Sequence, residues 1–130
     1  MVEQRYVLRV NQKSKNEEEV LEDRPISSLY DLIAEAHANI QRDFANIDPV
    51  VGVITKMRTI GIQADAVTID CLKTGKRILL VCHDEQPEVI NYQFCLRNED
   101  PADEFECIPL NNVTTKQLYD WMAANFSKQH

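Results

Sequence analysis

The chain has 130 residues, and its 21 acidic and 14 basic residues give a formal net charge of −7. This length suits one domain, 1–130, with a single core. The negative charge disfavours nucleic acid and anionic membrane surfaces as partners. No segment reaches the roughly 20 consecutive apolar residues that cross a bilayer, so we expect a small soluble protein without a membrane segment.

Residues 1–27 are predicted to form an N-terminal arm and an acidic loop. Residues 5–11 alternate between the two sides of an extended chain, which predicts a short strand. Residues 11–25 offer little to bury, and acidic side chains cluster there, as in a solvated and partly mobile loop. The first ten residues lack the apolar run of a secretory signal, so we expect a cytoplasmic protein. Its cysteines are then expected to be reduced and structural: Cys71, Cys82, Cys95 and Cys107.

Apolar residues recur at three- and four-residue steps through 29–47 and predict a helix. Ser28 is suited to cap its N-terminus. An Asp-Pro pair then suits a second helical start, and the apolar stripe continues. We therefore expect a helical region over 28–60, although the β-branched content leaves an extended conformation open for 50–55.

Four β-like segments between residues 62 and 110 predict an antiparallel meander of about four strands. The segment 78–82 is apolar on both faces, so we expect it in the centre of the sheet. Residues 90–97 alternate in polarity, which predicts a strand with one buried face. Pro109 makes the shorter segment 104–110 an expected edge strand.

The register of the first hairpin depends on the turn at Thr74-Gly75. A two-residue turn would place Cys82 opposite Val67. A three-residue turn with Gly75 left-handed would place it opposite Ala66. Because the second strand is apolar on both faces, the pattern does not choose between these registers.

A final helix is expected over residues 114–127, where Thr114 and Gln117 form a capping box. The predicted fold is thus α+β, with the helical region 28–60 and the C-terminal helix packed on one face of the meander. Size, acidity and this helix–sheet–helix order resemble those of small bacterial secretion chaperones or immunity proteins. That likeness assigns no site residue.

The sequence contains no phosphate-binding glycine loop, dinucleotide fingerprint, HExxH, GxSxG or CxxC motif. We therefore expect no cofactor and assign no catalytic or metal-binding residue. The densest polar group follows Cys82, where the predicted central strand ends, and carboxylates of the partner strand lie within reach. Imidazole and carboxylates together bind divalent cations, but a polar strand end beside a buried cysteine is the favoured interpretation. The candidate polar site comprises His83, Asp84, Glu85, Asp65 and Asp70.

Acidic residues also gather in and beyond the last two predicted strands, with Arg97 as the counter-charge in that part of the chain. If they converge in space, they form an anionic surface that steers a basic partner. This candidate partner surface comprises Glu88, Glu99, Asp100, Asp103, Glu104 and Glu106.

The leading functional hypothesis is a protein-binding or regulatory module without catalytic activity. A strand that is apolar on both faces needs cover on each side, from the N-terminal arm, another subunit or a partner protein, and we expect a homodimer or a contact with another protein. The first alternative is a small enzyme or weak metal site at residues 82–85. The second is an acidic mimic that occupies a basic nucleic-acid-binding protein.

Overall fold

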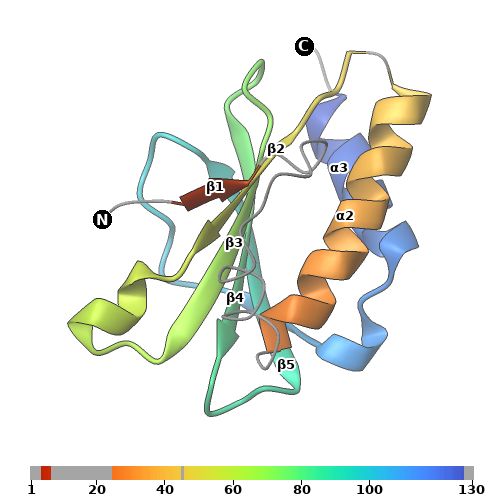
Figure 1. Ribbon diagram of the computed structural model, residues 1–130. Helices are drawn as coiled ribbons and strands as arrows, with labels where there is room; N and C mark the ends of the chain where they lie inside the picture. The colour runs from red at the N-terminus through yellow and green to blue at the C-terminus, as the bar shows by residue number, and fades with distance from the viewer. Residues whose placement is uncertain (1–3, 7–24, 45, 128–130) are drawn as a thin grey trace.

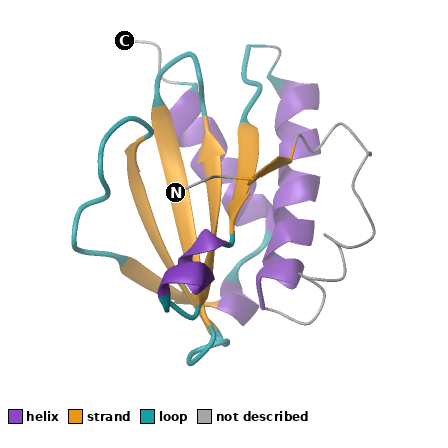
Figure 2. Cartoon of the chain, turned by 60° about the vertical axis from the view of Figure 1, so that its left-hand side comes forward, coloured by secondary structure: helices purple, strands orange, loops and turns teal. Residues whose placement is uncertain are grey.

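The computed structural model describes residues 4–6, 25–44 and 46–127. Helices α2 (Pro25–Asp43) and α3 (Thr115–Phe126) pack side by side on one face of a six-stranded antiparallel sheet (Figures 1 and 2). The strands lie in the sheet in chain order: β1 (Gln4–Tyr6), β2 (Val50–Ile54), β3 (Ala64–Asp70), β4 (Lys76–His83), β5 (Val89–Leu96) and β6 (Glu106–Pro109). Two short 3-10 helices, η1 (Lys56–Ile60) and η2 (Leu110–Asn112), precede β3 and follow β6. The predicted α+β class, the meander and the central position of residues 78–82 are confirmed.

Helix α2 forms because its apolar side chains recur on one stripe, and those at Leu29, Ile33 and Ile40 are fully buried against the sheet. It begins at Pro25 rather than near Ser28, since proline needs no hydrogen-bond acceptor in the first turn of a helix. The predicted arm and acidic loop fall mostly on residues 7–24, outside the described residues.

Residues 50–54 form β2, so the expected helix over this stretch was wrong and the extended alternative was right. Val51 and Val53 are fully buried in the core, and β2 pairs with β1 and β3. The cause is the run of β-branched residues, which pack well on a pleated surface. His37 of α2 forms a hydrogen bond with the residue that directly precedes β2: its Nε2 atom lies 2.6 Å from the Pro49 carbonyl oxygen.

The β3–β4 hairpin has a longer turn than either predicted register allowed. Residues 72–75 form the loop, and the N–H of Gly75 donates to the carbonyl of Cys71 at 2.8 Å. Gly75 is left-handed at φ 78°, as expected of a turn glycine. Cys82 consequently lies opposite Asp65. Both predicted registers, which placed Cys82 opposite Val67 or opposite Ala66, were wrong.

The core fills the space between the sheet and the helices. Val67, Ile69 and Leu80 point into it and are fully buried. On the opposite face, Thr68 is fully buried and Leu79 is 7% exposed. Much of the second face of the central strands is therefore covered within a single chain, which removes much of the reason for expecting a dimer.

Helix α3 begins as predicted. Thr114 is its N-cap, and the Thr114 hydroxyl accepts a hydrogen bond of 3.0 Å from the N–H of Gln117. Leu118, Met122 and Phe126 turn inward and are at most 1% exposed. This inward face closes the core beside α2.

Candidate functional site

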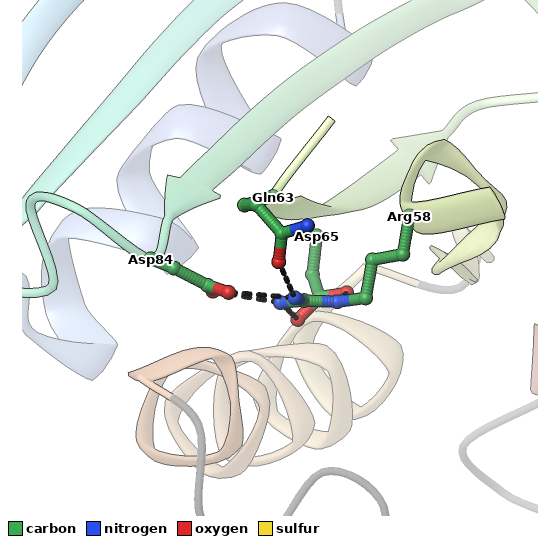
Figure 3. Close-up of polar contacts among 4 residues, drawn as sticks. All are labelled: Arg58, Gln63, Asp65 and Asp84. Carbon is green, nitrogen blue, oxygen red and sulfur yellow. Dashed lines mark hydrogen bonds and ion pairs between the residues drawn. The ribbon is translucent and has the colours of Figure 1, made fainter. Parts of the chain in front are cut away.

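Arg58 of η1 gathers the polar residues at one end of the β3–β4 hairpin (Figure 3). Its Nε and Nη2 atoms donate to the two carboxylate oxygens of Asp65 at 3.0 and 2.8 Å. Its Nη1 and Nη2 atoms donate to the carboxylate of Asp84 at 2.6 and 2.7 Å. Gln63 accepts a further bond from Nη1 at 3.4 Å. One guanidinium therefore binds two carboxylates, each through two hydrogen bonds.

The Arg58 cluster, formed by Arg58, Gln63, Asp65 and Asp84, is graded in its exposure to water. The side chain of Asp65 is 2% exposed, that of Arg58 21% and that of Asp84 38%. Hydrogen bonds to Asp84 and Asp65 raise the pKa of Arg58 above its ordinary value. The guanidinium thus stays charged and compensates the buried carboxylate, so this cluster fastens η1 to the hairpin.

The structure brings together only two members of the candidate polar site, Asp65 and Asp84. His83 pairs with Ala64, one position along from the Asp65–Cys82 pair, and so points to the other face of the sheet. Glu85 is exposed in the turn after β4. Asp70 lies at the far end of β3, about 17 Å from Asp65 along an extended strand.

Asp70 has its own cationic partners. It is fully buried, and its two carboxylate oxygens accept bonds from Arg77 at 2.6 and 2.9 Å. The Nε atom of Arg97 lies 3.7 Å from the same carboxylate. The negative charge of Asp70 is therefore also compensated by arginine.

Cys82 is poorly placed for chemistry as a nucleophile. Its side chain is 2% exposed, and burial, followed by the charge of Asp65, raises the pKa of the thiol to about 12. The thiolate, which is the nucleophilic form, is then scarce at neutral pH. Within the described part of the chain, no three His, Cys, Asp or Glu side chains are grouped to hold a metal ion.

A second candidate site lies where α3 meets β5. The rings of Tyr92 and Trp121 have centroids 4.6 Å apart, and Phe94 meets Trp121 edge-on at 5.5 Å. Phe94 remains 44% exposed and its neighbour Leu96 39% exposed. These four side chains, Tyr92, Phe94, Leu96 and Trp121, form what we call the aromatic surface.

The aromatic surface is open because β6 is short. Pairing between β5 and β6 ends at Tyr92 and Glu106, so Phe94 and Leu96 lie past the last residue pair. Had β6 begun at Glu104, as predicted, the same register would have placed Glu104 beside Phe94. The structure thus leaves uncovered a part of β5 that the sequence prediction covered.

The Gln93 side chain explains why β6 starts late. It points to the face opposite the helices and is 8% exposed. Its amide nitrogen donates to the carbonyls of Ala102 and Glu104 at 3.0 and 2.8 Å, and its amide oxygen accepts from the N–H of Ala102 at 2.8 Å. The connection 97–105 is therefore drawn around the edge of β5 to the second face (Figure 1).

The predicted partner surface is divided by this geometry, and all of its members are exposed. Glu99, Asp100, Asp103 and Glu104 lie in the connection that wraps around β5. Glu106 stands directly opposite Tyr92, on the face of the aromatic surface. Glu88 precedes the other end of β5, whose eight residues span about 25 Å.

Sequence reasoning missed Arg58 as an organising residue and missed the exposure of the aromatic surface. Arg58 lies in η1, outside the strands that carry the candidate polar site. The alternation of Tyr92, Phe94 and Leu96 did reveal their shared face, but their exposure depends on where β6 begins. That boundary is set by Gln93 through contacts nine and eleven residues away.

Comparisons with known proteins give no assignment: no family model, no curated protein and no solved structure matches the chain. None of the helices among residues 25–44 and 46–127 is long and apolar enough to cross a membrane.

Proposed function

We propose that this protein is a protein-binding module whose docking site is the aromatic surface. The observation that carries the proposal is Phe94, a ring braced edge-on by Trp121 yet 44% exposed to water. Binding energy in protein interfaces concentrates on a few aromatic side chains, with Trp and Tyr prominent among them. A ring already fixed by its neighbours loses little conformational freedom when a partner covers it.

The surroundings also suit a binding role. The Arg58 cluster and the Asp70 pair are internally neutralised, whereas Phe94 and Leu96 of the aromatic surface face outward. All four cysteines are free thiols, so the proposal places the protein in a reducing compartment such as the cytoplasm.

Selection of random peptides on the folded protein tests the proposal. We expect enriched peptides to shift the backbone amide resonances of Phe94, Leu96 and Trp121, and to lose binding when Phe94 is replaced by serine. Ile60→Ser is the matched control, because Ile60 is an aliphatic side chain 67% exposed in η1, which precedes β3 at the opposite end of the sheet from Leu96. Peptides that bind elsewhere, or that bind the Phe94→Ser variant equally well, would refute the proposed site.

A further inference from the structure

The register of the sheet decides which backbone groups of β5 face its outer edge. In an antiparallel ladder, residues that exchange hydrogen bonds with a given neighbour alternate along the strand. The N–H of Leu110 donates to the carbonyl of Glu88 at 2.8 Å, directly before Val89 begins the pairing with β6. On the other side of β5, the N–H of Arg97 donates to the carbonyl of Gly75 at 2.8 Å. The even-numbered residues of β5 therefore direct their N–H and carbonyl groups outward, and the odd-numbered residues direct theirs to β4.

This outer edge is unpaired at the end of β5. Pairing with β6 stops at Tyr92 and Glu106, so the outward groups of Phe94 and Leu96 lie past the last residue pair. The carbonyl of Leu96 accepts a bond from the N–H of Glu99 at 3.2 Å in the turn that follows. Within the described residues, the N–H and carbonyl of Phe94 and the N–H of Leu96 have no backbone partner. Unpaired groups on a sheet edge are a template for another strand.

The strand that precedes this point in the sheet does not close the edge. In the register of β5 and β6, Glu104 would stand opposite Phe94. Instead, the carbonyl of Glu104 accepts a bond from the Gln93 side chain at 2.8 Å, on the face of the sheet opposite the helices. The same side chain holds Ala102 on that face. Strand β6 therefore does not occupy the place beside Phe94 in the plane of the sheet.

The side chains next to this edge favour apolar residues on the segment that binds. A residue paired with Phe94 places its side chain on the face of the aromatic surface, as Glu106 does opposite Tyr92. Phe94 is 44% exposed and Leu96 39% exposed, so a partner can cover both. The carboxylate of Glu106 on this face is matched by Lys76 opposite Leu96, so charge does not select the occupant.

A second copy of the chain is a poorer occupant of this edge. In each copy, β6 already pairs with the rest of β5, so two copies would meet only through the last residues of each strand. Each copy also carries a net charge of −7, and the resulting repulsion opposes the contact. A free extended segment of another protein has neither restriction.

We propose that an extended segment of a partner protein adds to the sheet as a strand at Phe94 and Leu96, in line with β6 and antiparallel to β5. Its apolar side chains at alternate positions lie on the aromatic surface, and its backbone bonds the three unpaired groups of the edge. Strand addition gives affinity through main-chain hydrogen bonds and specificity through alternate side chains. This mode of binding rests on the proposed function and adds the conformation of the partner.

Peptide probes with N-methylated backbones test strand addition without altering the protein. The parent probe is Lys-Thr-Val-Thr-Val-Thr-Lys. Methylating both Val nitrogens removes the N–H that donates to the Phe94 carbonyl, whichever Val stands opposite Phe94, whereas the Thr nitrogens on the N-terminal side of each Val point away from β5. We expect the Val-methylated probe to bind at least about tenfold more weakly than the parent, and a probe methylated at those two Thr nitrogens to bind like the parent. The fluorescence of Trp121, the chain's single tryptophan, measures all three affinities.

Amide hydrogen exchange supplies the readout on the protein side. In the free protein, the amides of Phe94 and Leu96 should exchange faster than that of Tyr92, which is paired with β6. The parent probe should slow both amides at least about tenfold, because they become hydrogen-bonded. If both amides are as protected as that of Tyr92 in the free protein, the edge is already closed, which overturns strand addition and leaves the proposed function intact.

The remaining outcomes separate the two proposals. Equal binding of the parent and Val-methylated probes, lost in Phe94→Ser, would leave the proposed function standing and refute strand addition. No binding by the parent probe also overturns strand addition; if selected peptides still bind at Phe94, the proposed function stands, and if none does, both proposals fall. A dimer in ultracentrifugation that protects the Phe94 amide would identify a second copy as the occupant and overturn the partner segment.

Discussion

Arg58 supplies a positive charge to the buried carboxylate of Asp65 and so offsets the free-energy cost of burying it. Asp65 is 2% exposed, and two hydrogen bonds from Arg58 neutralise it. Taking an ion pair out of water costs free energy, but leaving one member without its partner costs more. The Arg58 cluster therefore fixes the position of η1 relative to this end of the β3–β4 hairpin.

Replacing Arg58 by alanine should lower the free energy of unfolding by about 3 kcal/mol, because it removes the positive charge and the two hydrogen bonds that Arg58 supplies to the buried Asp65 carboxylate. Urea denaturation measures the loss. Arg42→Ala is the control: Arg42 also pairs with an aspartate, but its side chain is 67% exposed, so its midpoint should stay near that of the unaltered protein. Asp65→Asn in the Arg58→Ala background should recover part of the loss. Equal midpoints for the two single variants would contradict this account.

Cys82 should make stability sensitive to alkaline pH. Burial raises the pKa of its thiol from 9.0 to about 12, so the unfolded chain loses this proton at lower pH than the folded one. The contribution of the protonated thiol is complete below about pH 9 and is lost as the pH rises towards 12. Between pH 8 and 11, the protein should therefore lose about 2 kcal/mol more stability than a Cys82→Ala variant, as measured by denaturation at each pH.

Thiol labelling of the folded protein at pH 8 provides an independent check on Cys82. Cys107 is exposed and should react first, whereas Cys82 should react only when the chain unfolds. Labelling of Cys82 ahead of Cys107 would show that the buried, protonated description is wrong.

At the scale of elements, the connection 97–105 depends on one side chain. Gln93 supplies all three hydrogen bonds that draw Ala102 and Glu104 behind β5, and these bonds are partly buried. The start of β6, and with it the opening of the aromatic surface, follows from this attachment.

Gln93→Ala should release the connection while leaving the sheet folded. We expect amide hydrogen exchange at Ala102 to accelerate at least about tenfold, since its acceptor is lost, and global stability to fall by about 1–2 kcal/mol. Gln86→Ala, in the exposed turn before β5, is the control and should change neither quantity. Unchanged protection at Ala102 would mean that another contact holds the connection.

Predictability from sequence differed between elements for identifiable reasons. Helix α2 and strand β5 were predictable because one face of each is apolar at the right spacing, and Thr114 marked the start of α3. Strand β2 was ambiguous because a short β-branched run fits a buried strand or a helical turn. Its pairing with β3 decides the matter, and that contact is not local.

The candidate site was predictable only in its parts. Asp65 and Asp84 were named, but the β3–β4 register that brings them together depends on the length of the turn. Strand β4 is apolar on both faces, so its sequence pattern fits several registers equally well and does not distinguish between them. Arg58 joins residues 7 and 26 positions away, which no local pattern reveals.

At the scale of the whole molecule, helices α2 and α3 and the sheet share one continuous set of buried side chains. We therefore expect a single cooperative unfolding transition, as small domains with one core usually show. The fluorescence of Trp121, which lies between α3 and β5, should change at the same urea concentration as helical circular dichroism. Two separated transitions would show that α3 or the sheet unfolds independently and that the chain is not one domain.

The order of strands in the sheet also determines how the protein is assembled during synthesis. From β2 to β6, each new strand emerges beside a neighbour that the ribosome has already made. The core-facing side of the sheet, however, waits for α3, whose Leu118, Met122 and Phe126 are among its most deeply buried side chains. Until those residues leave the exit tunnel, the nascent chain presents apolar surface to the cell, and this aggregation hazard ends only when α3 packs against the sheet.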